Sequence, residues 1–131
     1  MIGIDTNVLV RFVVKDDPTQ APAAVRMIQG LSPEEPGWIS ILVLTELVWT
    51  LRRVYKLDRT SIAGVLERLL SSNDTVLEQR DVVRRALLAY QSSKADFADC
   101  VIAVTANLAG CSRMVTFDEI AARDLGMELL A

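Results

Sequence analysis

Apolar and polar residues along this chain alternate in blocks that predict short strands separated by amphipathic helices. Apolar runs predict five strands, at residues 1–4, 37–40, 75–77, 114–117 and 127–130. Helical periodicity fills the segments between them, at 8–14, 18–29, 41–55, 59–70, 81–91 and 96–110. Strands that alternate with helices of this length predict an α/β fold with a mostly parallel sheet covered by helices on both faces.

Polar residues at the predicted helix starts support these boundaries. Asp17, Ser40, Asp58 and Asp96 can each accept hydrogen bonds from the free N–H groups of a first helical turn. Pro18 suits the first position of the helix that Asp17 begins. The chain shows no linker or repeat, and its 131 residues are expected to form one domain, 1–131.

The composition excludes several kinds of active site. The chain has no histidine, so it cannot contain a Ser-His-Asp triad, a Cys–His pair or a histidine base. Its two cysteines, Cys100 and Cys111, are too few for a zinc site and are expected to pack among apolar neighbours in a reducing compartment. Carboxylates, a lysine or a metal ion must therefore carry any catalysis.

The chain also lacks the signals of export and of membrane insertion. An acid, Asp5, stands where a secretory signal would carry positive charge. No apolar run is long enough to span a bilayer. We expect a soluble, cytoplasmic protein with no membrane partner.

Acidic residues gather near the ends of the predicted strands. Asp5 follows the first strand, Asp118 follows the fourth, and Glu46 lies in the helix after the second. Asp96 and Asp99 open the helix that precedes the fourth strand. Because ligands of open parallel sheets bind beyond the carboxyl ends of the strands, these acids are candidates for one site.

The helix that follows Asp99 is the sharpest local signal. It has no charged residue before Arg113 and is apolar on all sides, which predicts a buried helix with Asp96 and Asp99 on one face of its first turn. A structural role remains open for each acid at this stage. Asp5, Asp96 and Asp118 can cap helices, Asp99 can complete a capping box, and Glu46 can lie on a solvated face.

Gathering several carboxylates in one place has an electrostatic cost. Two unit charges about 4 Å apart repel by about 4 kcal/mol at an effective dielectric constant near 20. A hard divalent cation such as Mg²⁺ removes that cost, because it takes carboxylate ligands together with substrate phosphate. Two such ions would activate water for phosphodiester hydrolysis.

Four segments resemble, in order, the acidic motifs of PIN-domain nucleases. They are IDTNVL at 4–9, TEL at 45–47, DFADCVIA at 96–103 and VTFD at 115–118. The match covers nearly the whole chain. In size the chain is most similar to the VapC-type toxins of type II toxin–antitoxin pairs.

This resemblance implies a PIN-like three-layer α/β/α sandwich with a sheet of four or five strands. It implies an endoribonuclease that uses Mg²⁺ or Mn²⁺, a VapB-type antitoxin and a homodimer. It implies that the metal ligands are Asp5, Glu46, Asp96 and Asp99. It implies that the catalytic acids are Asp5, Glu46, Asp99 and Asp118. Thr6, Asn7 and Thr116 would orient these groups by hydrogen bonds.

The charge distribution permits an RNA substrate despite the net charge of −3. Without the five candidate acids, 12 acidic residues face 14 basic ones. Arg11 and Arg53 lead the candidates for binding RNA phosphates, with Arg52, Lys56 and Arg113 behind them. No aromatic-rich strand suggests a surface for base stacking. The alternative function is a catalytically silent PIN-like domain that only binds RNA or a partner.

Overall fold

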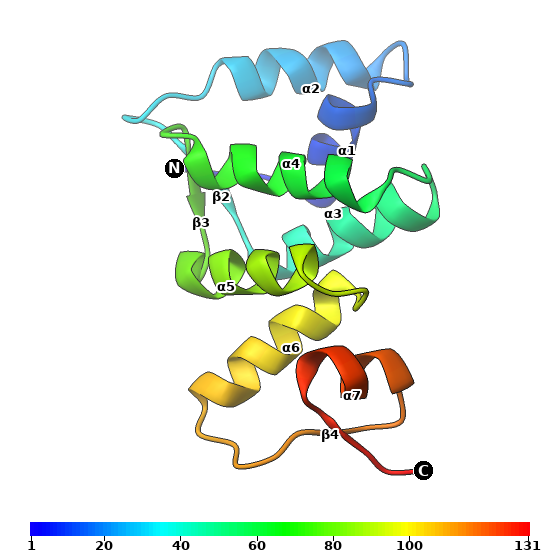
Figure 1. Ribbon diagram of the computed structural model, residues 1–131. Helices are drawn as coiled ribbons and strands as arrows, with labels where there is room; N and C mark the ends of the chain where they lie inside the picture. Colours follow the sequence, from blue (N-terminus) through cyan, green and yellow to red (C-terminus); the bar gives the residue numbers. More distant parts are fainter. The chain divides into compact units, whose positions relative to one another are not determined.

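The computed structural model describes residues 1–131 and divides the chain into two compact units, Met1–Arg80 and Asp81–Ala131. Figure 1 shows the order of the elements along the chain. The first unit contains β1 (Ile2–Gly3), α1 (Thr6–Val14), α2 (Gln20–Gln29), β2 (Gly37–Ile39), α3 (Ile41–Arg53), α4 (Arg59–Ser71) and β3 (Thr75–Leu77). The second contains α5 (Arg80–Gln91), which begins at the boundary, α6 (Phe97–Leu108), β4 (Val115–Thr116), α7 (Glu119–Leu125) and β5 (Glu128–Leu129).

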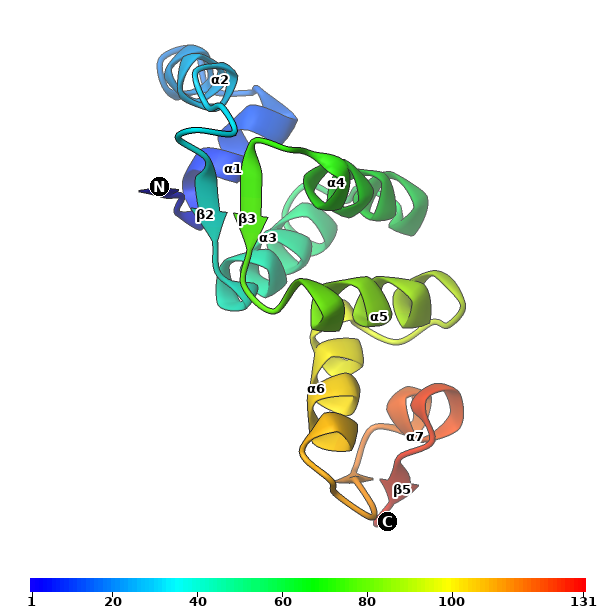
Figure 2. The same cartoon turned by 90° about the vertical axis from the view of Figure 1, so that its left-hand side faces the viewer.

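All five strands are parallel to their partners, which confirms the α/β class and the parallel sheet. Strands β1, β2 and β3 form one sheet in that order, and Figure 2 shows β2 and β3 side by side, pointing the same way. Strands β4 and β5 pair in a separate sheet of two. The sequence predicted a single sheet of four or five strands. The difference concerns β4 and β5, which have two residues each and pair with each other in a sheet of their own.

Helix α3 occupies the centre of the first unit's core. Leu44, Leu47 and Leu51 are completely buried and Val48 is nearly so. Their spacing is the i, i+3, i+4, i+7 pattern of one apolar helix face. Helix α3 contacts α1 and α4, and α4 in turn contacts β3. The buried face therefore fixes which residues of α3 point outward.

Side-chain caps begin α3 and α4 at the residues that the sequence predicted. The Ser40 hydroxyl accepts from the Val43 N–H at 3.1 Å, and the Asp58 carboxylate accepts from the Ser61 N–H at 2.7 Å. Helix α2 begins two residues later than predicted, at Gln20. The reason is that Asp17 accepts from the N–H groups of residues 19 and 20, so residues 18 and 19 form a turn before the helix.

Helix α6 is buried only at its start, so the expectation of a helix buried on all sides is wrong. Phe97, Cys100 and Val101 are buried, whereas Ile102 is 43% exposed and Leu108 is 53% exposed. The second unit is small and has too few elements to cover an apolar helix all round. The expectation for the cysteines holds for Cys100 alone, because Cys111 is exposed; both are free thiols. None of the helices combines the length and the apolarity that crossing a membrane requires.

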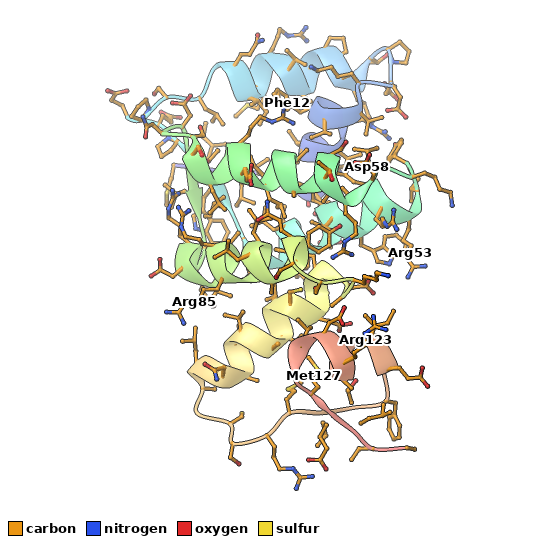
Figure 3. The ribbon with its side chains drawn as sticks, viewed as in Figure 1. Phe12, Arg53, Asp58, Arg85, Arg123 and Met127 are labelled. Atoms are coloured by element: carbon orange, nitrogen blue, oxygen red, sulfur yellow. The ribbon has the colours of Figure 1, made fainter.

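Replacing the cap residue Asp58, which Figure 3 labels at the start of α4, should destabilise the protein in a pH-dependent way. Hydrogen bonds from Ser61 lower the pKa of this carboxyl below its ordinary value of 3.8. The stabilisation is therefore present above the unfolded-state pKa and is lost as the pH falls through the folded-state pKa. Asp58→Ala should lower Tm by a few degrees at pH 7, and thermal melts should show the gap closing below about pH 3.8.

Asp58→Asn is the matched control, because an amide oxygen also caps a helix but does not titrate. A difference in Tm between Asp58→Ala and the parent that stays constant down to pH 2 would contradict the inference that the cap acts through its charged form.

Candidate active site

The first candidate, Asp5, lies at the junction of β1 and α1. Its backbone is extended, with φ −82° and ψ 160°, so the chain leaves the strand there and turns into the helix. Its carboxylate accepts a hydrogen bond from the N–H of the next residue, Thr6, at 2.7 Å. The side chain is exposed. Asp5 therefore caps α1 and still presents carboxylate oxygen to solvent.

A hydrogen bond joins the first two acidic motifs. The Thr6 hydroxyl donates to Glu46 Oε1 at 3.3 Å, across 40 residues of sequence. Glu46 is exposed on the second turn of α3, on the side opposite the buried leucines. Thr6 thus contacts both Asp5, through its N–H, and Glu46, through its hydroxyl. Its role in orienting these acids stays a prediction.

In the second unit, Asp96 occupies the N-cap position of α6 without capping it. Its backbone is extended, but its side chain accepts no hydrogen bond from the first turn. Asp99 follows in that turn and is half-buried. The structure therefore does not support the capping interpretation of Asp96, whose carboxylate is left exposed and available to a ligand.

Asp118 and Thr116 form a local hydrogen-bonded turn at the end of β4. The Asp118 carboxylate accepts from the Ala121 N–H at 2.8 Å and so caps α7. The Thr116 hydroxyl accepts from the Asp118 N–H at 3.0 Å. The orienting role of Thr116 also stays a prediction. Asp118 is exposed, so capping leaves part of its carboxylate accessible.

The electrostatics of Asp99 are unfavourable to its charge. Partial burial, followed by the charges of Asp96 and Asp118, raises the pKa of Asp99 above its ordinary value of 3.8. No positively charged side chain offsets these effects. A carboxylate held among other carboxylates without a counter-charge is typical of functional sites, where a ligand supplies the missing positive charge.

The donor chemistry suits a hard divalent cation, although neither set of acids is a complete metal site. All five candidates offer carboxylate oxygen, which Mg²⁺ and Mn²⁺ prefer. The structure contains no group of three or more acidic, cysteine or histidine side chains arranged to hold a metal ion. The acids form two local sets, Asp5 with Glu46 in the first unit and Asp96, Asp99 and Asp118 in the second.

The two leading candidates for RNA binding differ in availability. The Arg11 guanidinium donates to Gln20 at 2.8 Å, Tyr55 at 2.9 Å and Asp16 at 3.2 Å, so it holds α1 against neighbouring elements. Arg53 is exposed and has no side-chain partner. Arg11 is thus committed to the fold, whereas Arg53 is free to bind an anion.

The remaining sequence candidates are less informative. Arg113 pairs with Glu128 at 2.8 Å, and Arg52 donates to the Leu57 carbonyl at 3.4 Å. The Asn7 side chain makes no hydrogen bond and borders a shallow hollow of about 270 Å³ between α1 and α2. A larger cavity, of about 480 Å³, is mainly apolar, and none of the candidate residues lines it.

Sequence reasoning missed one exposed aromatic residue beside a candidate acid. Trp49 lies three residues after Glu46 on the same face of α3, and 60% of it is exposed. The sequence has no aromatic-rich strand, and this tryptophan lies on a helix face instead. The signal was present in the helical spacing of Glu46, Trp49 and Arg53.

Removing the charge of Asp99 should stabilise the metal-free protein. A raised carboxyl pKa means that ionisation above that pKa costs stability, and that the cost vanishes when the group is protonated in both the folded and the unfolded state. In the presence of a chelator, Asp99→Asn should raise Tm at pH 7, and melts near pH 3 should show no difference. The control Asp81→Asn removes an acid from the first turn of α5 and should bring no gain. A lower Tm for Asp99→Asn at pH 7 would contradict the inference that the Asp99 charge destabilises the metal-free protein.

Comparison with known proteins identifies the family of the chain. The chain is 28% identical over 115 residues to a VapC ribonuclease of Aquifex aeolicus (strain VF5), an alignment that covers 87% of this chain and 84% of that protein. The family model of the PIN domain matches residues 2–124, which include all four acidic motifs. The chain therefore belongs to the PIN domain family.

Proposed function

We propose that this protein is a metal-dependent endoribonuclease and the toxin of a VapBC-type pair. The carrying observation is the uncompensated Asp99 carboxylate, which burial and the charges of Asp96 and Asp118 disfavour. The PIN family match and the similarity to a VapC ribonuclease supply the class of reaction. Asp5 and Glu46 would join Asp96 and Asp99 as ligands of Mg²⁺ or Mn²⁺, and Asp118 would act with them in catalysis.

The chain's own residues would do three things in this reaction. The carboxylates of Asp5, Glu46 and Asp99 would fix the ligand geometry, and one of them would accept the proton of the attacking water. Thr6 would hold the Glu46 carboxylate in place through their hydrogen bond. When bound, the metal ion supplies an activated water and neutralises charge on the phosphate. No covalent intermediate is required, which suits a chain without histidine.

The partners follow from the same proposal. A VapB-type antitoxin would block the site, and the protein would act in the cytoplasm, where its RNA substrate is found. The homodimer that the resemblance implies is a prediction that sedimentation analysis can test. The silent-domain alternative would need a site that has lost its acids, and all four acidic motifs of this chain are intact.

Purified protein should cut total RNA into discrete products when Mg²⁺ is present. A chelator should abolish cutting, and Asp99→Asn, prepared identically, should reduce it at least a hundredfold, because one ligand carboxylate is gone. Sequencing gels of the products measure this. Equal cutting by the parent and Asp99→Asn would overturn the site assignment, and no cutting by the parent on any RNA tested would favour the silent domain.

Divalent metal should also stabilise the folded protein. A ligand that binds only the folded state raises Tm in proportion to the logarithm of its concentration above Kd. Millimolar Mg²⁺ should therefore raise the parent's Tm, and Asp99→Asn should respond less. NaCl at equal ionic strength controls for screening of the carboxylates. A parent Tm that responds to Mg²⁺ and to NaCl alike would argue against a shared metal site.

A further inference from the structure

Helix α7 carries a candidate catalytic acid at its start and a second carboxylate in its last turn. Asp118 caps the start of α7 by accepting from the Ala121 N–H, and Asp124 lies near the other end. Their backbone positions are about 9 Å apart along the helix axis. The charges that act on Asp99 are those of Asp96 and Asp118, so Asp124 does not belong to the candidate site. Its role must come from its own hydrogen bonds.

Both oxygens of the Asp124 carboxylate accept hydrogen bonds. Oδ1 accepts from the Nε–H of Arg123, which Figure 3 labels on α7, at 2.8 Å. Oδ2 accepts from the backbone N–H of Lys94 at 2.8 Å, across 30 residues of sequence. These two hydrogen bonds, that of Arg123 first, lower the pKa of Asp124 below its ordinary value of 3.8. The carboxylate is therefore charged at neutral pH, and a charged acceptor makes a stronger hydrogen bond than a neutral one.

Lys94 lies in the segment that joins α5 to α6, two residues before the candidate ligand Asp96. Ala95 and Phe97, on either side of Asp96, are each only 1% exposed. The Phe97 ring packs edge-to-face on Tyr90, with the ring centroids 5.9 Å apart. Asp96 itself is exposed, with an extended backbone. The course of this buried segment therefore sets where the Asp96 carboxylate lies, and the Lys94 N–H links the segment to α7.

Charge repulsion works against this arrangement in the metal-free protein. Asp96 and Asp99 lie at the start of α6 and Asp118 lies at the start of α7, and the charges of Asp96 and Asp118 both disfavour ionised Asp99. Like charges repel, so the two helix starts tend to separate unless a bond holds them together. The hydrogen bond from Lys94 to Asp124 joins the two segments on which these acids lie. It therefore opposes their separation.

We propose that Asp124 is a positioning residue, which holds the start of α6 against α7 through the Lys94 N–H and so keeps the α6 acids at a fixed distance from Asp118. This inference rests on the proposed metal-dependent function. Mg²⁺ tolerates little departure from octahedral geometry, so the spacing of its carboxylate ligands affects how tightly it binds. Asp124 acts through the backbone and not as a ligand, because both of its oxygens already accept hydrogen bonds.

Amide hydrogen exchange tests the hydrogen bond in the metal-free protein. In Asp124→Ala, with a chelator present, the Lys94 amide should exchange faster by about tenfold or more, because a hydrogen bond to a charged group is lost. The Cys100 amide, which donates to the Asp96 carbonyl at 3.0 Å in the first turn of α6, should also exchange faster. Arg123→Ala removes the ion pair but keeps the Lys94 bond, so it should exchange like the parent. Unchanged exchange at either amide in Asp124→Ala would overturn the inference.

Calorimetric titration with Mg²⁺ separates positioning from stability. Asp124→Ala should bind Mg²⁺ about tenfold more weakly, at the lower end of the effect of residues that orient metal ligands. Asp124→Asn keeps a weaker, neutral acceptor for the Lys94 N–H, so its affinity should fall between those of the parent and Asp124→Ala; it carries the test if the alanine variant does not fold. Asp58→Ala is the matched control, because it removes another carboxylate that accepts a backbone N–H, at 2.7 Å, and should lower Tm without weakening Mg²⁺ binding. Parent-like affinity in both Asp124 variants, or an equal loss in Asp58→Ala, would overturn the inference.

Cleavage measured against Mg²⁺ concentration distinguishes a positioning residue from a catalytic one. Asp124→Ala retains every proposed ligand, so saturating Mg²⁺ should restore its kcat on total RNA, with the midpoint shifted about tenfold and KM for RNA unchanged. Asp99→Asn lacks a ligand and should not be restored. Cleavage by Asp124→Ala that stays low at saturating Mg²⁺ would overturn the positioning role. A parent that neither binds Mg²⁺ nor cuts RNA would overturn the proposed function, and amide exchange in the metal-free protein would still decide whether Asp124 holds the start of α6.

Discussion

The arrangement of the first unit depends on the burial of one face of α3. Leu44, Leu47 and Leu51 are removed completely from solvent, and each is of a kind whose truncation in a core typically costs about 2–5 kcal/mol. A helix locked in this way cannot rotate about its axis without exposing leucines. The outward direction of Glu46, and hence its hydrogen bond with Thr6, follows from that constraint. The core packing therefore sets the position of Glu46, although Glu46 lies outside the core.

The second unit shows the opposite balance between stability and chemistry. Asp99 is partly buried beside two other acids with no compensating cation, and Asp96 stands at an N-cap position without making the hydrogen bond that would stabilise the helix. Selection for stability alone would replace either residue with a better cap or an uncharged side chain. Two residues that destabilise the same helix start are understandable if a bound cation makes their contribution to stability favourable.

Local chemistry made much of this molecule predictable from its sequence. Ser40 and Asp58 mark helix starts because each side chain accepts a hydrogen bond from an N–H group only three residues ahead. The α/β class follows from the alternation of strands and helices. The pairing of strands and the exposure of α6 could not be predicted, because they depend on what lies beside each element. The same holds for Arg11, whose three partners come from residues 16, 20 and 55. The exposure of Trp49 is of the same kind, because it depends on which face of α3 the core buries.

A protein with a net negative charge needs local groups that attract RNA, because its overall charge does not. The net charge of −3 gives no general attraction to a polyanion. Arg11, Arg113 and Arg123 are bound to acceptors within the chain, so these three could meet a phosphate only by giving up a partner. Binding would then rely chiefly on a metal ion held by the acids, with exposed cations such as Arg53 in support. The contribution of those exposed cations would be screened by salt, whereas a metal ion held between the acids and the phosphate would be screened much less.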